Sequence, residues 1–166
     1  MLVYKVATAV ASWSSSSTKY DVFLNFRGDD TRDNFISHLY KELDQKGIKT
    51  FMDDKLKRGD KISSALLKTI EKSKISLIIF SKNYASSSWC LDELVHILQC
   101  KERSGDQVHV VPIFYGVEPS SVRTQSGSYE VGLAELEKRC KDKILVWRDA
   151  MKKAVEFSGW DSQNVR

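Results

Sequence analysis

An aromatic residue and a carboxylate, Trp89 and Glu93, lie four residues apart in the run SSSWCLDEL. If this run is helical, residues i and i+4 share a face of the helix, so the indole and the carboxylate lie side by side. An aromatic wall beside a carboxylate suits a sugar or a cationic ring. A buried core tryptophan with a solvated glutamate is the more common arrangement, so the position of the pair in the fold has to decide between the two.

A cation and a glycine, Arg27 and Gly28, directly follow the β-rich run YDVFLNF. The guanidinium can bind a phosphate or a ribose, and the glycine permits close approach of the backbone to a ligand. The alternative is that Arg27 pairs with an acidic residue of the next segment (Asp29, Asp30 or Asp33) and that Gly28 only serves the turn. The dipeptide by itself favours this structural alternative.

Other site chemistries find little support in the sequence. The histidines and cysteines are His38, His96, His109, Cys90, Cys100 and Cys140. The histidines show no ligand spacing and the cysteines form no C-x-x-C pair, so we predict no metal site, no disulfide framework and a reducing compartment. No G-x-S-x-G or P-loop motif occurs. Asp53-Asp54 suggests a phospho-receiver pocket, but the first and third predicted strands lack the acidic residues that such a pocket needs.

Hydrophobic periodicity and turn residues divide the chain into alternating strands and helices. The predicted strands are 20–26, 48–53, 75–81 and 108–115. The helix after the first strand has Phe35, Leu39 and Leu43 on one face and ends at Gly47. The next helix is predicted to begin at Ser63 or Ser64, the third is capped by a serine of 86–88, and the chain after 115 is mostly helical.

This alternation predicts a parallel sheet with helices on both faces, because each parallel crossover needs a helix. Pro112 cannot donate a ladder hydrogen bond, so strand 108–115 is expected at or near an edge, or with a bulge. Ligands of such sheets bind beyond the carboxyl ends of the strands, where the strand order reverses. Arg27 and the pair Trp89 and Glu93 are both predicted to lie at that end.

A chain of 166 residues, 42% hydrophobic and 29% charged, fits one globular domain. The segment from Lys46 to Lys74 contains nine basic and four acidic residues, and the net charge of the whole chain is +4. A solvated loop explains this excess, and phosphate or nucleic-acid binding is the alternative. No apolar run has the length of a membrane span. Residues 1–18, with four serines at 14–17, are predicted to be a disordered leader.

Several segments together resemble the Toll/interleukin receptor (TIR) domains of plants. They are YDVFLNFRGDDTRDNFISHLYKEL from Tyr20, GIKTFMDDKLKRGDKI from Gly47, SLIIFSKNYASSSWCLDEL from Ser76, VVPIFYGVEPSSVRTQSG from Val110 and the final WRDAMKKAVEFSGW. The resemblance implies a domain over 19–160 with a flavodoxin-like, doubly wound α/β sheet of five parallel strands. TIR domains usually continue into one more helix, so 161–166 is expected to be a truncated tail and that helix to be missing.

The resemblance also implies an activity and a cellular role. It implies an NAD+ nucleosidase of plant innate immune signalling, activated by self-association and located in the cytoplasm or also in the nucleus. NAD+ or NADP+ is the substrate, nicotinamide and ADP-ribose or its cyclic form are the products, and no prosthetic group is expected. Glu93 falls on the catalytic glutamate of the motif W-C-L-x-E-L. The positions that match nucleotide contacts are Arg27, Gly28, Arg32, Asp53, Lys57, Ser87 and Trp89.

A single carboxylate can support this chemistry. Glycosidases need two carboxyl groups because the leaving oxygen must be protonated, whereas the nicotinamide of NAD+ is already cationic and leaves as a neutral molecule. Glu93 is then expected to orient the ribose hydroxyls and to stabilise the developing oxocarbenium charge, while Trp89 shapes the pocket.

The alternatives to catalysis concern binding. Ser37 and His38 match a serine-histidine pair that the family uses for self-association. A catalytically silent scaffold that acts by homotypic contacts with other TIR domains is therefore the main alternative. Nucleic-acid binding through the basic loop is a weaker one, and no membrane partner is expected. The missing helix normally packs beside the first helix in an association surface, so its absence bears on assembly.

Overall fold

Five strands form one parallel sheet in the order β2-β1-β3-β4-β5. The computed structural model describes residues 2–12, 19–52 and 62–161. The strands are β1 (Tyr20–Asn25), β2 (Thr50–Met52), β3 (Ser73–Phe80), β4 (His109–Phe114) and β5 (Trp160–Asp161). This order confirms the flavodoxin-like, doubly wound sheet. The order reverses between β1 and β3, so the ligand end of the sheet is where these two strands finish.

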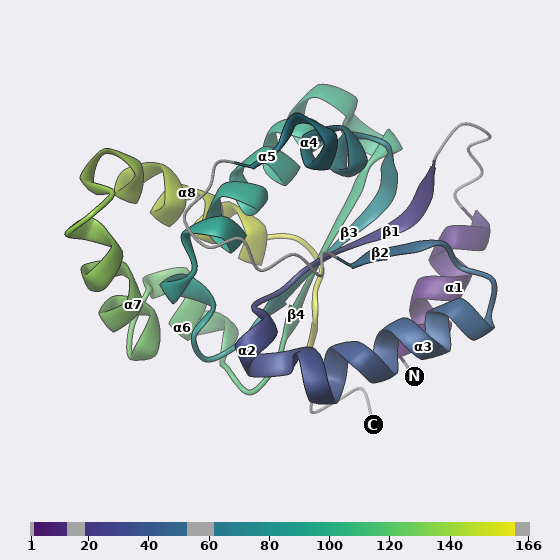
Figure 1. Cartoon of the computed structure of the whole chain (residues 1–166), viewed down its shortest axis with the longest axis horizontal. Helices are drawn as coiled ribbons and strands as arrows, with labels where there is room; N and C mark the ends of the chain where they lie inside the picture. Colours follow the sequence, from purple (N-terminus) through teal and green to yellow (C-terminus); the bar gives the residue numbers. More distant parts are fainter. Residues whose placement is uncertain (1, 13–18, 53–61, 162–166) are drawn as a thin grey trace.

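Helices cover both faces of the sheet (Figure 1). The helices are α1 (Leu2–Ser12), α2 (Gly28–Thr31), α3 (Ser37–Gln45), α4 (Ser64–Glu71), α5 (Ser88–Ser104), α6 (Pro119–Thr124), α7 (Ser128–Glu137) and α8 (Ile144–Val155). A π-helical turn, η1 (Arg32–Ile36), joins α2 to α3, and short 3-10 turns occur at η2 (Tyr84–Ser86), η3 (Gly105–Gln107) and η4 (Lys141–Lys143). Helices α1 and α3 lie on one face, and α4, α5 and α8 lie on the other. No helix formed by the described residues has both the length and the hydropathy that crossing a membrane requires.

Each central strand contributes side chains alternately to two hydrophobic cores. In β1, Val22 and Leu24 pack on the side of α1 and α3, while Phe23 packs on the side of α4 and α5. The same alternation places Leu77 in the first core and Ile78 in the second. Successive side chains of a strand point to opposite faces, and here both faces are buried. Strands β2 and β5 form the edges of the sheet, and β4 lies next to the edge strand β5.

The local signals for helix ends agree with the structure. The Ser63 hydroxyl accepts a hydrogen bond from the backbone N–H of Leu66 and caps α4. Gly47 follows α3 with φ of +73°, a conformation that side-chain-bearing residues rarely adopt. The π-helical turn before α3 was not predicted, because its register change leaves the apolar spacing of the helix intact.

The proline of β4 lies near the edge of the sheet, as predicted. Pro112 is paired in register with Ile78 of β3, and β5 begins to pair only at the next residue, Ile113. Gly159 runs so close to this strand that a Cβ atom there would lie 2.7 Å from the carbonyl oxygen of Pro112. The edge strand can therefore approach β4 only because Gly159 has no side chain.

The prediction of a disordered leader is wrong for residues 2–12, which form α1. Leu2, Val3 and Val6 are buried against the core beneath α3, and Lys46 of the α3 end lies over the ring of Tyr4 at 4.3 Å. These apolar residues recur at helical spacing, but the stretch is too short to be stable alone. Burial of a side chain such as Val6 contributes about 1.5–3 kcal/mol, and that tertiary contact stabilises the helix.

Gly132 allows α7 to pack directly on η2, the turn between β3 and α5. A Cβ atom at Gly132 would lie 2.7 Å from Ser86 Oγ and 3.0 Å from the backbone carbon of Ala85. We expect Gly132→Ala to lower the free energy of unfolding by about 1–2 kcal/mol in urea denaturation, because overpacking outweighs the gain in helix propensity. The neighbouring Val131→Ala is the control, since Val131 is exposed; an equal loss in both variants would contradict this account.

Candidate functional site

The predicted glutamate lies where the strand order reverses. Glu93 is on the second turn of α5, and Asn25 is the last residue of β1. The two side chains meet across the end of the sheet, where the Asn25 amide nitrogen donates a hydrogen bond to Glu93 Oε1 at 2.9 Å. This position is the ligand end of an open parallel sheet.

The carboxylate of Glu93 is buried and held from two sides. The residue is only 3% exposed, and its second oxygen, Oε2, accepts a hydrogen bond from the indole N–H of Trp89 at 3.2 Å. The expectation that Trp89 and Glu93 share a helix face is confirmed. The alternative of a solvated glutamate is not observed, because helical spacing places the side chain on a face but does not say what covers that face.

Asn25 and Tyr84 support this carboxylate, and the sequence analysis did not identify them. The Tyr84 hydroxyl donates to Asn25 Oδ1, and the Asn25 amide also donates to the carbonyl oxygen of Cys90 at 3.2 Å. Burial raises the pKa of Tyr84 well above its usual range, so the hydroxyl remains a donor. The signal available in the sequence was a polar residue at the end of an apolar strand, next to Arg27.

Cys90 lies beside the glutamate but is not activated as a nucleophile. Its thiol donates to the carbonyl oxygen of Phe26 at 3.2 Å. Burial, reinforced by the negative charge of Glu93, raises the pKa of Cys90 to about 12. The thiolate is the reactive form of cysteine, so this side chain is inert at neutral pH.

Ser87 and Trp89 lie at the start of α5, beside the carboxylate. The Ser87 hydroxyl caps the helix by accepting a hydrogen bond from the backbone N–H of Cys90 at 3.2 Å. Trp89 is half-buried and its indole faces Glu93. Two of the predicted nucleotide contacts are therefore neighbours of the predicted catalytic residue.

Arg27 makes ion pairs within its own loop. Its guanidinium lies 3.3 Å from Asp29 and 3.0 Å from Asp30, so the structural alternative considered for the Arg27-Gly28 dipeptide is observed. Asp30 in turn accepts hydrogen bonds from Ser81 Oγ at 2.6 Å and from the backbone N–H of Asn83 at 2.8 Å. The loop after β1 is thereby tied to the end of β3.

The other predicted contacts are distributed around this loop. The Arg32 guanidinium stacks over the ring of Phe26 at 5.2 Å, and a Cβ atom at Gly28 would lie 3.0 Å from Arg32 Nε. Gly28 therefore accommodates Arg32, in addition to any approach to a ligand. Asp53 and Lys57 lie outside the described residues.

The predicted association pair is separate from the site. Ser37 and His38 are both exposed on α3, which covers the opposite face of the sheet from α5. The Ser37 hydroxyl donates to the carbonyl oxygen of Arg32. His38 has a solvent-facing position that a partner could contact without disturbing the core.

Asp92, the neighbour of Glu93, connects α5 to α8 instead of facing the site. It accepts hydrogen bonds from the Trp147 indole at 2.9 Å and from Lys143 at 3.2 Å. It points away from Glu93, as the rotation of about 100° per helical residue predicts. A substitution of Asp92 would disturb helix packing. In experiments that replace Glu93, the exposed Glu102 of the same helix is therefore the better control residue.

Comparison with known proteins identifies the family. The TIR domain family model matches residues 19–166, and the chain belongs to this family. The chain is 54% identical over 146 residues to disease resistance protein RUN1 of Vitis rotundifolia, covering 87% of the chain and 11% of that protein. It is 50% identical over 153 residues to TMV resistance protein N of Nicotiana glutinosa, covering 90% of the chain and 13% of that protein. The chain thus spans only a small part of these relatives.

A solved structure supports the same assignment. The TIR domains in the structure of the activated Roq1 resistosome, which directly recognises the pathogen effector XopQ, are 52% identical to this chain. The match has a TM-score of 0.80 and covers 88% of this chain and 89% of that chain. The fold and the family are therefore those of TIR domains found in plant disease-resistance proteins.

The ionised form of Asp30 stabilises the loop around the site. Burial opposes its ionisation, but hydrogen bonds from Ser81 and Asn83 and the charge of Arg27 outweigh burial, so the pKa of Asp30 is lowered. A lowered pKa in the folded state stabilises the protein above the usual aspartate pKa, and the contribution is lost as the pH falls through the folded value.

We expect Asp30→Asn to lower the free energy of unfolding by about 1–3 kcal/mol at pH 7, because buried donors lose their charged acceptor. The difference from the parent should shrink as the pH is lowered towards 3, as urea denaturation can measure. Asp29→Asn is the control, because Asp29 is exposed and its ion pair contributes little. A deficit for Asp30→Asn that stays constant with pH would refute the role of the charge.

Proposed function

We propose that this chain is an NAD+ nucleosidase of plant immune signalling, in which Glu93 is the catalytic carboxylate. The observation that carries the proposal is a glutamate buried at the switch point of the sheet, with hydrogen bonds from Asn25 and Trp89. Burying a carboxylate is unfavourable unless it is hydrogen-bonded. A carboxylate that is buried at the ligand end of an open parallel sheet is a candidate for a chemical role.

The chemistry requires one negative charge near the ribose of the substrate. Cleavage of the nicotinamide-ribose bond develops positive charge on the ribose carbon, and the departing nicotinamide becomes neutral without a proton. A fixed carboxylate stabilises that charge most effectively where water is excluded. The amide of Asn25 holds Oε1, and Oε2 is the oxygen that becomes available to the ribose hydroxyls when Trp89 releases it.

We infer that Trp89 regulates access to Glu93. Its indole donates to Oε2 and is half-buried, so a rotation of this side chain removes that hydrogen bond from Oε2. The substrate then exchanges one hydrogen bond, from indole to ribose hydroxyl. This exchange explains how a glutamate that is only 3% exposed can contact a nucleotide.

We expect Glu93→Gln to reduce nicotinamide release from NAD+ by at least about 100-fold, because the amide keeps the shape but lacks the charge. Release is measured by chromatography at protein concentrations where the parent is active. The matched control is Glu102→Gln, which makes the same change at an exposed position of α5. If Glu93→Gln retains the rate of the parent, the catalytic role is wrong.

The stability of the variants has to be measured alongside their activity. Glu93→Ala leaves the N–H groups of Asn25 and Trp89 without their acceptor, and we expect it to lower the free energy of unfolding by about 1–3 kcal/mol. Glu93→Gln keeps one acceptor oxygen but turns its NH2 group towards the other donor, so we expect a smaller loss of stability than for Glu93→Ala. Loss of activity in a glutamine variant that unfolds at the same urea concentration as the parent therefore reports on chemistry.

We further propose that self-association activates the domain. The alternative function is a scaffold that associates with other TIR domains without catalysis. Ser37→Ala with His38→Ala should lower the mass measured by light scattering at high concentration, since both residues are exposed on α3. Gln99→Ala with Glu102→Ala is the control pair on the opposite face of the sheet. An unchanged mass for both pairs over a wide concentration range would reject this surface, and association without nicotinamide release would favour the scaffold.

A further inference from the structure

A carboxylate, an imidazole and a thiol meet where the end of α4 packs against α5. They belong to Glu71, the last residue of α4, and to His96 and Cys100, one turn apart on α5. One ligand atom from each side chain lies within 4.8 Å of the other two. This cluster is separate from Glu93, and no part of the proposed nucleosidase reaction uses it.

One nitrogen of the His96 imidazole lacks a hydrogen bond within the described residues, and this indicates a site for a ligand. Its Nε2 atom is buried and makes no hydrogen bond to any part of the chain that the structure describes. Glu71 Oε1 lies 3.4 Å from it, but this contact does not have hydrogen-bond geometry. Buried polar groups are normally satisfied by a partner, so this nitrogen is available to a metal ion.

A positive group already lies between the other two ligands. The guanidinium of Arg103 donates to Cys100 Sγ at 3.4 Å and lies 3.6 Å from Glu71 Oε1. Its side chain is 63% exposed, so its movement into solvent uncovers little buried surface. The site therefore attracts positive charge, and a metal ion can replace the guanidinium of Arg103.

We propose that Glu71, His96 and Cys100 bind a zinc ion, with water as the fourth ligand. Thiolate, imidazole and carboxylate are the ligand types that zinc prefers, and three protein ligands with an open fourth position are a common zinc arrangement. On binding, the Sγ–H bond of Cys100 breaks, its proton passes to the buffer, and Sγ and the metal form the new bond. No electron is transferred.

The site closes by small side-chain movements. Zinc-ligand bonds of about 2.0–2.3 Å in a tetrahedron separate the ligand atoms by about 3.3–3.8 Å. His96 and Cys100 already lie on one helix face, and Glu71 is exposed at a helix end, so its carboxylate can move inward. A bound ion would link α4 to the helix that carries Glu93.

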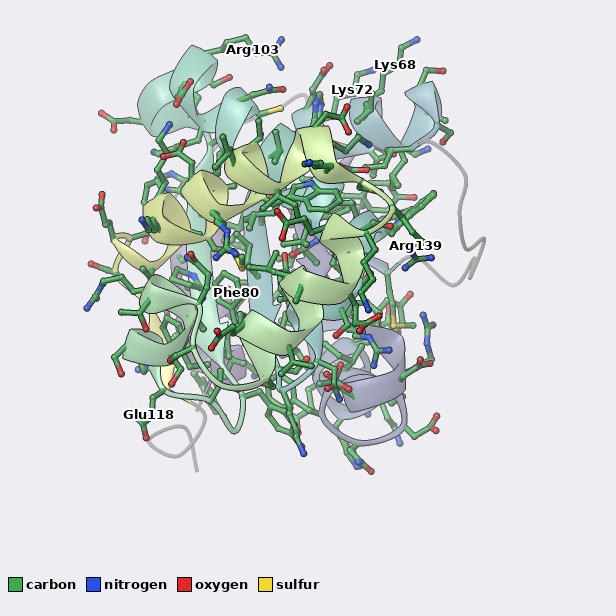
Figure 2. The ribbon with its side chains drawn as sticks, turned by 90° about the vertical axis from the view of Figure 1, so that its left-hand side faces the viewer. Lys68, Lys72, Phe80, Arg103, Glu118 and Arg139 are labelled. Atoms are coloured by element: carbon green, nitrogen blue, oxygen red, sulfur yellow. The ribbon has the colours of Figure 1, made fainter. Side chains whose placement is uncertain are left out.

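Nearby positive charges limit the affinity. Figure 2 shows Lys68, Lys72 and Arg103 at the same end of the molecule. Both lysines are exposed; Lys68 is on α4 and Lys72 directly follows it. Their repulsion opposes binding of a divalent cation. We therefore expect a site weaker than the closed four-ligand sites of zinc fingers, and one that tightens when Arg103 is removed.

The test is titration of the full chain with Co²⁺ as a spectroscopic probe, followed by displacement with Zn²⁺. The parent should develop cobalt-thiolate absorption that Zn²⁺ abolishes. Cys100→Ser should lose this absorption, and His96→Gln should weaken binding at least about 10-fold, as the loss of a ligand interaction does. Arg103→Ala should bind more tightly than the parent, a result that a merely structural cluster does not produce.

The controls change the same residue types outside the cluster. Cys140→Ser and His109→Gln should bind Co²⁺ as the parent does, since Cys140 follows α7 and His109 is the first residue of β4. Absence of the thiolate band in the folded parent, or its persistence in Cys100→Ser, overturns the proposal. Because the readout is absorption, a failure here is distinguishable from a failure of the proposed nucleosidase activity. Far-UV circular dichroism confirms that each variant is folded.

Discussion

The hydrogen bonds to the carboxylate of Glu93 are the constraint on which the end of the sheet depends. A buried carboxylate is stable only if donors surround it, and these donors come from β1 through Asn25 and from α5 through Trp89. Tyr84 fixes Asn25 from the turn that joins β3 to α5. One side chain therefore couples a strand, a turn and a helix, and the proposed chemistry uses a group that the fold already holds rigidly.

Helix α5 connects this site to the rest of the domain. Its N-terminus is capped by Ser87, its second turn carries Glu93, and its third and fourth turns carry His96 and Cys100. Asp92 binds α8 from the side that faces away from Glu93. Adjacent residues of a helix point in different directions. One helix can therefore carry the proposed catalytic residue, two of the proposed zinc ligands and the residue that binds α8.

Much of the fold and part of the site could be predicted from the sequence, because the signals were local. The cap at Ser63, the glycine at 47 and the proximity of Trp89 to Glu93 depend on residues within four positions of each other. Residues 2–12 were misjudged because their helix is stabilised only by packing beneath α3. The burial of Glu93 was missed for the same reason, since one of its two hydrogen-bond donors, Asn25, lies 68 positions away in sequence.

By itself, the sequence determined the alternation of strands and helices, the TIR family and the residue types available for chemistry. These follow from periodicity, turn residues and motifs, which are properties of neighbouring positions. Tertiary structure alone decided that Asn25 holds Glu93, that Asp30 binds Ser81, and that Glu71 meets His96 and Cys100. The physical reason is that hydrogen bonds and metal ligands require contact between side chains, and the crossing of strands and helices creates contacts that sequence distance does not encode.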